Sequence, residues 1–197
     1  MKTLLLLPIG LAIFAFPAPD AVATPPRGEH DWVVDPVHSS VAFRVKHANI
    51  AFFKGTFDVI NGRITLDPAK PEAGSVELTI PVDSVDTNDK KRDDHLKAPD
   101  FFNAKENPEI TFRSTKIEKK GDALEVTGDL AMNGKKKSTV IQVAKTGEGE
   151  FMGKRVGYEA KFTIKRSDFG VDYGVAEKTL ADEVTLMIDL ELAQPKK

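Results

Sequence analysis

The chain has 197 residues, with 28 Lys or Arg against 30 Asp or Glu, so its formal net charge is −2. A nearly neutral chain lacks the basic excess with which proteins hold the phosphates of nucleic acids, so we expect no nucleic-acid partner. Cysteine is absent, which excludes disulfide bonds, thiol catalysis and thiolate metal sites.

The first 23 residues have the pattern of a signal peptide. Lys2 supplies a positive charge, residues 4–16 form an apolar run, and an Ala-Val-Ala sequence ends at Ala23. The run is too short for a transmembrane helix, which needs about 20 apolar residues. We therefore expect cleavage near Ala23, a mature protein in the periplasm, and a flexible lead-in over residues 24–31.

Apolar and polar residues alternate with a period of two through much of the chain from Trp32 onward. The clearest segments are 39–46, 75–82, 108–115, 123–132, 156–165 and 183–193. Such alternation is typical of antiparallel strands with one buried and one solvated face. Asn-Gly pairs at 61–62 and 133–134 provide turns between strands. Only residues 89–97 have a helical pattern, with Asn88 as the expected N-cap.

About eight strands in one domain can pack as a sandwich or close as a barrel. The Cys–Trp–Cys pattern of immunoglobulin domains is absent. We therefore predict an all-β antiparallel barrel over residues 32–193, followed by a tail at 194–197. A barrel of this size either packs shut or holds one small ligand. Inward-facing phenylalanines fit both outcomes, because such residues also fill ordinary cores.

Candidate metal-binding and catalytic residues are few. The four histidines form no close pair of the kind that binds zinc, and Asp93-Asp94-His95 has the composition of a solvated turn. No G-x-S-x-G motif is present. We expect no metal, no cofactor and no enzymatic activity. The alternative is an enzyme that uses His38 or His95 with a neighbouring aspartate.

Five segments match one known family in order along the chain. They are DPVHSSVAFRVKH (35–47), GTFDVINGRITLDP (55–68), VDSVDTNDKKRDDHLKAPDFFNAKENPEITFRST (82–115), TGDLAMNG (127–134) and FTIKRSDFGV (162–171). On these segments the chain resembles the YceI-like family over essentially its whole mature length. The resemblance implies an exported protein with an extended, eight-stranded, lipocalin-like antiparallel barrel and one short helix. It also implies a polyisoprenoid, an isoprenoid quinone or a similar long-chain amphiphile inside the barrel.

The resemblance and the alternation together give the candidate ligand-binding residues. We expect the apolar cavity to be lined by Phe43, Val45, Phe57, Ile80, Val82, Phe101, Phe102, Phe112, Phe162, Ile164 and Phe169. The resemblance places the Phe101-Phe102 loop against the cavity and the helix over the barrel wall. Residues 51–54 depart from the family pattern by being more aromatic, so the entrance is expected to differ there.

Polar residues of the same motifs are the candidate structural or mouth residues. Arg92, Asp93 and His95 match the helix motif of the family, Arg166 matches a later motif, and His38 comes from the first matching segment. By this resemblance we interpret Arg92, Asp93 and Arg166 chiefly as a packing or ion-pair set. A role near a ligand headgroup is secondary.

Two hypotheses for the function of a barrel follow, one from the resemblance and one from the residues alone. The leading one is a periplasmic carrier of an isoprenoid or fatty lipid that makes transient contact with membranes, with homodimerisation left open. The alternative is a filled barrel that serves as a stress-response or interaction protein and has no lipid ligand. They differ in whether the interior is hollow, which the alternation pattern does not decide.

Overall fold

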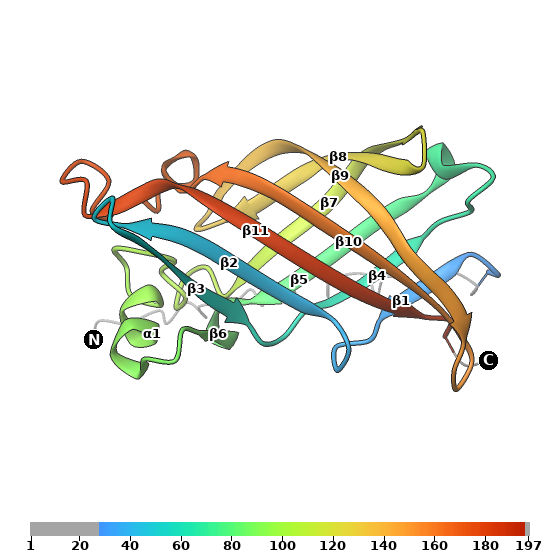
Figure 1. The fold of residues 1–197 in the computed structure, drawn as a ribbon, viewed down its shortest axis with the longest axis horizontal. Coiled ribbons are helices and arrows are strands. Elements are labelled where there is room, and N and C mark those ends of the chain that lie inside the picture. The colour runs from blue at the N-terminus through green and yellow to red at the C-terminus, as the bar shows by residue number, and fades with distance from the viewer. Residues whose placement is uncertain (1–27, 196–197) are drawn as a thin grey trace, which may run out of the picture.

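The computed structural model describes residues 28–195. The predicted signal peptide and the first part of the predicted lead-in lie outside this range. Within it, the strands form one antiparallel sheet (Figure 1). They are β1 Asp31–Val34, β2 Ser40–His47, β3 Ala51–Phe57, β4 Asn61–Thr65, β5 Ser75–Pro81, β6 Val85–Asp86, β7 Glu109–Lys120, β8 Ala123–Met132, β9 Lys135–Glu150, β10 Lys154–Lys165 and β11 Leu180–Ala193. The lead-in expected over residues 24–31 ends earlier, because Asp31 already begins β1.

Three pairs of short strands behave as single strands that are interrupted by a turn or loop. β1 and β2 both pair with β11, while β4 pairs with β1 and β3 pairs with β2. In the same way, β5 pairs with β4 and β6 pairs with β3. Counted once each, these three interrupted strands and β7 to β11 make a closed barrel of eight antiparallel strands. The predicted eight-stranded barrel is confirmed.

The barrel closes where the two ends of the described chain meet. Val33 of β1 pairs with Ala193 of β11. The Asp35 amide then donates a hydrogen bond of 2.8 Å to the Glu191 carbonyl. A closed sheet has no long free edge, so backbone donors and acceptors are paired around the ring.

Each strand turns one face to the interior and the other to water. On β10, Ala160 and Phe162 point inward, whereas Lys161 and Thr163 are exposed on the outer face. The outer faces of neighbouring strands are rich in Lys, Glu and Thr in the same way. The hydrophobic pattern of the sequence therefore fixes which side of each strand forms the interior.

Two local features of β7 and β8 fit bulky side chains into the wall. Gly128 lies beside Phe112, and a Cβ atom at Gly128 would lie only 2.5 Å from the Phe112 ring. The register of β7 against β8 shifts between Ser114 and Lys116, which marks a bulge. The bulge places Ile117 on the same inner face as Phe112 despite their odd spacing in sequence.

The helix α1, Lys90–Leu96, and the turns that follow it lie at one end of the barrel (Figure 1). Asp89 is the N-cap, since its carboxylate accepts a hydrogen bond of 3.1 Å from the Arg92 amide. The predicted N-cap, Asn88, instead adopts a left-handed backbone conformation with φ of 60°. Leu96 is the buried residue of the helix and anchors it to the barrel.

In the described part of the chain, three short 3₁₀ helices interrupt or extend the strands: η1 Pro71–Ala73, η2 Val82–Ser84 and η3 Arg166–Phe169. The second forms the break between β5 and β6, and the third continues β10 into the loop toward β11. Among residues 28–195, no helix has the length and hydrophobicity required to cross a lipid bilayer.

Candidate functional site: an apolar cavity inside the barrel

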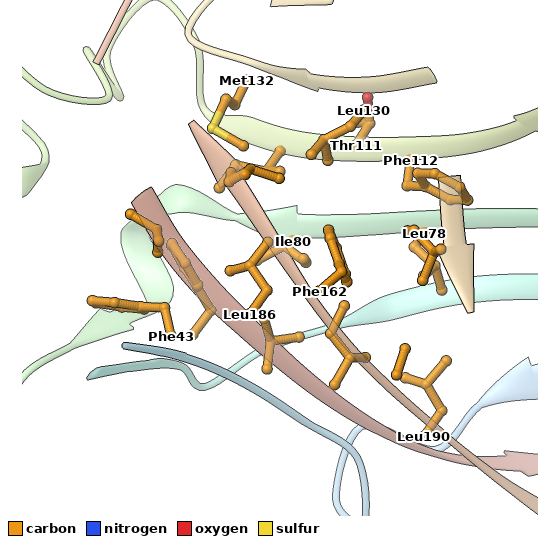
Figure 2. Close-up of a pocket in the computed structure, with 18 of the residues that line it drawn as sticks. Phe43, Leu78, Ile80, Thr111, Phe112, Leu130, Met132, Phe162, Leu186 and Leu190 are labelled. Carbon is orange, nitrogen blue, oxygen red and sulfur yellow. The ribbon is translucent and has the colours of Figure 1, made fainter. Parts of the chain in front are cut away.

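The barrel interior contains a cavity of about 170 Å³, counted as the space in which the centre of a water molecule can lie. Its wall comes from the inner faces of the strands, and Figure 2 shows side chains of several strands directed toward a common space. They include Phe43, Leu78, Ile80, Thr111, Phe112, Leu130, Met132, Phe162, Leu186 and Leu190. Almost all lining side chains are apolar, so the cavity suits a hydrocarbon ligand better than a polar one.

The side chains of the inner face do not fill the interior. Phe162 and Ile164 of β10 and Leu186 and Ile188 of β11 point inward and line the cavity, yet each remains partly accessible. In a close-packed core, such inward side chains would be surrounded by other atoms. The barrel is therefore hollow along β10 and β11.

Nine of the eleven apolar residues expected at the cavity are among those that line it. They are Phe43, Val45, Phe57, Ile80, Phe101, Phe102, Phe112, Phe162 and Ile164. Val82 and Phe169 lie elsewhere, in η2 and η3, where they are 1% and 2% exposed. These two pack the turns at the ends of β5 and β10 and do not face the cavity, so the structure assigns them packing in place of ligand contact.

Other lining residues were not singled out from the sequence. Leu186 and Leu190 lie on β11, and the alternation of that segment already predicts that both face inward. Phe53 also lines the cavity, while its neighbour Phe52 points outward. Alternation with a period of two does not predict which of two adjacent phenylalanines faces inward. The register of the β2–β3 hairpin decides, because it sets Phe53 opposite inward-facing Val45.

Residues 90–107, named the cap below, contribute side chains to one end of the cavity. Leu96, Phe101 and Phe102 line it from this segment. The Phe102 amide donates a hydrogen bond of 3.0 Å to the Leu96 carbonyl, which folds the segment back on the end of the helix. The position that the family resemblance implies for the Phe101-Phe102 loop is thus the observed one.

An aromatic group connects the cap to the loop between β10 and β11. The ring centroids of His95, Phe101 and Tyr173 lie 4.9 to 5.0 Å apart. His95 Nε2 also lies 2.6 Å from Asp100 Oδ2 within the cap. These are side-chain contacts, so the cap can separate from the β10–β11 loop without breaking any strand pairing.

Arg92 and Asp93 both bind Thr87, a buried residue just before α1. Thr87 donates from its amide to the Asp93 carboxylate at 2.9 Å and also from its hydroxyl. Arg92 donates to the Thr87 hydroxyl at 2.8 Å and to its carbonyl at 2.6 Å. The Arg92 guanidinium also lies over the Phe53 ring, 5.0 Å from its centroid. These contacts fix the start of the cap against β3.

Of the three residues expected to form a packing or ion-pair set, Arg166 lies apart from Arg92 and Asp93 and binds backbone carbonyls. The Arg166 side chain is buried, and it donates hydrogen bonds of 2.8 to 3.0 Å to the carbonyls of Val171, Leu180 and Ala181. Within residues 28–195, no carboxylate lies at ion-pair distance from it. Burial lowers the pKa of the guanidinium from its ordinary value. Arg166 thus holds the β10–β11 loop in shape where it borders the cavity.

His38 lies apart from the cap, in the loop between β1 and β2. Its Nδ1 is 3.2 Å from Asp35 Oδ2. Arg155 donates to the same Asp35 oxygen and, at 3.0 Å, to Glu191. The Arg155 guanidinium, with a smaller contribution from His38, holds the pKa of Asp35 at about 2. Although Asp35, His38 and Glu191 are close enough to hold a cation, Arg155 already supplies the positive charge there.

In the described part of the chain, each of the two histidines considered for catalysis has a carboxylate partner, and no side-chain hydroxyl is hydrogen-bonded to either. Among residues 28–195, the side-chain hydrogen bonds of His38 and His95 run to Asp35 and Asp100 respectively. A hydroxyl nucleophile that a histidine activates must lie within hydrogen-bond reach of the imidazole. The geometry around these histidines therefore supports a structural role, and the cavity is the feature that suits a ligand.

The model of the YceI-like domain matches residues 32–192. The chain belongs to the YceI-like family. Among its YceI-like relatives, protein YceI of Escherichia coli O157:H7 is 39% identical over 197 residues, which covers 97% of this chain and 98% of the relative. The resemblance noted in the sequence is thus confirmed along nearly the whole length of both proteins.

Solved structures show the same YceI-like barrel. The crystal structure of BcnA from Burkholderia cenocepacia matches with a TM-score of 0.74 and 32% identity, covering 80% of this chain and 98% of BcnA. A polyisoprenoid binding domain from Saccharophagus degradans, implicated in plant cell wall breakdown, matches with a TM-score of 0.64 at 15% identity, covering 83% of this chain and 98% of that domain. At such low identity the second likeness establishes the shared fold.

Proposed function

We propose that the protein binds a polyisoprenoid, an isoprenoid quinone or a similar long-chain amphiphile in its barrel and carries it through the periplasm. The hollow and almost wholly apolar interior carries this proposal. Water finds few hydrogen-bond partners in such a cavity, whereas a hydrocarbon chain gains free energy by leaving water for it. The polyisoprenoid binding domain of the same fold supports the ligand class. The signal-peptide pattern of the sequence supports the compartment.

The cavity volume limits how much of a ligand fits without rearrangement. At about 170 Å³ the cavity is smaller than the roughly 300–1,000 Å³ of typical small-molecule pockets. A long isoprenoid chain would therefore need Phe101 and Phe102 of the cap to move, or would extend beyond the barrel.

The energetics suit a carrier that releases its ligand. Burial of each CH₂ group stabilises a bound chain by about 0.8 kcal/mol relative to water. The alternative location of such a lipid is a bilayer, which is equally apolar, so the net free energy of transfer is close to zero. Few polar side chains line the cavity, Thr111 and Arg166 among them. Selectivity should therefore follow chain length and shape more than the headgroup.

Native mass spectrometry of the mature protein purified from its own cells, followed by solvent extraction, tests this proposal. We expect a stoichiometric mass increase from an isoprenoid or fatty lipid. Leu186→Trp, which adds bulk inside the cavity, should lower the bound fraction about tenfold by displacing at least two CH₂ groups. The matched control is Met187→Trp, because Met187 faces outward on the same strand opposite Lys161.

The Leu186→Trp variant also separates a hollow barrel from a filled one. In a packed core, overpacking of this kind destabilises a protein by about 1–3 kcal/mol, whereas a hollow interior accepts the larger ring. A protein that carries no lipid, takes up neither ubiquinone nor a polyprenol, and is destabilised by Leu186→Trp would support the filled-barrel alternative. The carrier proposal would then fail.

A further inference from the structure

The tip of the β2–β3 hairpin exposes apolar side chains at the end of the barrel where α1 lies (Figure 1). Ile50 is 83% exposed and Phe52 is 52% exposed. The turn is built from Ala48 and Asn49, both of which have positive φ angles. The Ala48 amide donates a hydrogen bond of 2.9 Å to the Thr179 carbonyl, which ties the tip to the β10–β11 loop. An ordered hairpin therefore holds Ile50 in water.

Three cations stand behind this apolar tip on the outer face of the same hairpin. Arg44 lies directly opposite Lys54, and Lys46 lies opposite Phe52. The Arg44 guanidinium is 3.5 Å from the centroid of the Phe52 ring, and Lys46 Nζ is 5.9 Å from it. Among the described residues, none of the three cations forms an ion pair. Beside Arg44 on β11 lies Thr185, which is uncharged.

This arrangement has an unfavourable electrostatic energy within the protein alone. Like charges directly opposite each other on paired strands destabilise a sheet. An anionic partner outside the barrel would remove that repulsion, and the exposed Ile50 and Phe52 indicate that the partner also has an apolar layer. Apolar side chains at a protruding tip with cations behind them are the elements of an interfacial membrane anchor.

We propose that the Arg44–Lys54 hairpin, named the docking tip, binds the surface of a bilayer that contains anionic phospholipid. Ile50 and Phe52 enter the boundary between headgroups and acyl chains, while Arg44, Lys46 and Lys54 contact lipid phosphates. The long side chains of the cations extend toward the headgroups while their methylene groups pack against apolar surface. Docking in this sense needs no ligand in the cavity.

The docking tip also gives the cavity a direct relation to the membrane. Phe53 lies between Phe52 and Lys54 in sequence but points inward and lines the cavity. One face of β3 would therefore touch the bilayer while the other contacts the cargo. This second step, the loading of lipid from the docked membrane, rests on the proposed carrier function.

Co-sedimentation of the mature protein with vesicles tests the docking tip. We expect binding to vesicles of phosphatidylcholine with phosphatidylglycerol, and little binding to phosphatidylcholine alone. Arg44→Gln and Lys54→Gln should each lower the partition coefficient about fivefold, and Ile50→Ser should lower it about tenfold. Phe151→Ser is the matched control, because Phe151 is 65% exposed on the β9–β10 hairpin at the opposite end of β11.

Three results would overturn the inference. Equal binding to neutral and anionic vesicles would show that the cations do not contribute to binding. A partition coefficient that falls as much in Phe151→Ser as in Ile50→Ser would show that the docking tip is not the binding site. A dimer in analytical ultracentrifugation that Ile50→Ser dissociates would assign the tip to contact between two copies of the chain. Bound lipid, measured by native mass spectrometry in the same variants, keeps the two proposals apart. A protein that contains bound lipid but does not bind vesicles would contradict the docking proposal and leave the carrier proposal intact.

Discussion

Asp35 owes its acidity chiefly to one neighbour, Arg155. The guanidinium donates to Asp35 and to Glu191 at the point where β1 meets β11. Because the hydrogen bond from Arg155 favours the charged form of the carboxyl group, the pKa of Asp35 falls to about 2 from an ordinary value of 3.8. Arg155 on β10 therefore links the loop after β1 to Glu191 of β11, and its bond to Asp35 depends on pH.

Replacing Asp35 with Asn should lower the free energy of unfolding near neutral pH by about 2 kcal/mol at most. The folded-state pKa is depressed, so this stabilisation is present above the unfolded value of 3.8 and is lost as the pH falls to about 2. Urea unfolding of the wild type and of Asp35→Asn should therefore give curves that converge over this window. A difference that stays constant down to about pH 2 would contradict the assignment.

Single residues were the least predictable from sequence where turns intervene. Val82 and Phe169 continue apolar patterns, but each falls in a 3₁₀ turn that rotates it away from the cavity. The family resemblance implies a packing or ion-pair role for Arg166 without naming its partners, which are three backbone carbonyls. Phe53 was missed because its direction depends on the hairpin register.

At the level of elements, strands with a regular apolar alternation were predicted closely. The segment 123–132 has the same bounds as β8, and 183–193 lies within β11. β9 is not predictable from the local pattern, because most of its side chains are exposed and its alternation is weak. Pairing with β8 and β10 on both sides makes it a strand. Tertiary hydrogen bonds thus supply what the local pattern lacks.

The helix α1 depends on Asp89 as its N-cap residue. Asp89→Ala should lower the free energy of unfolding by about 1 kcal/mol, because the Arg92 amide loses its acceptor. Hydrogen exchange should become faster over the cap, residues 90–107, before it does so in the barrel strands. Lys91→Ala, an exposed change in the same helix, is the control and should alter stability by less than about 0.5 kcal/mol. Unchanged exchange in Asp89→Ala would show that the cap is held without its N-cap.

At the scale of the whole molecule, the barrel follows from the sequence but its hollowness does not. Inward apolar alternation looks the same in a filled and in a hollow eight-stranded barrel. The difference comes from how the inner side chains divide the space once the ring has closed. Along β10 and β11 they leave Leu186 and Ile188 facing a void.

A hollow barrel should be less stable empty than loaded. If the lipid is present at about a hundred times its dissociation constant, binding adds about 2.7 kcal/mol. For a domain of this size, that raises the melting temperature by about 5–10 °C. Calorimetry of the protein before and after removal of lipid on a hydrophobic resin measures the shift. The same melting temperature in both samples would contradict stabilisation by the ligand.

The pairing of β1 with β11 determines when, during synthesis or export, the barrel can close. β1 pairs with β4 on one side, and on its other side it pairs with the last residues of β11. A chain that emerges from the ribosome, or passes through a pore with its N-terminus first, stays an open ribbon until its final strand is free. Its apolar inner face is in contact with water throughout that interval, when aggregation is most rapid. A product that stops before Leu180 lacks the fourteen residues of β11, so its barrel has no strand with which to close.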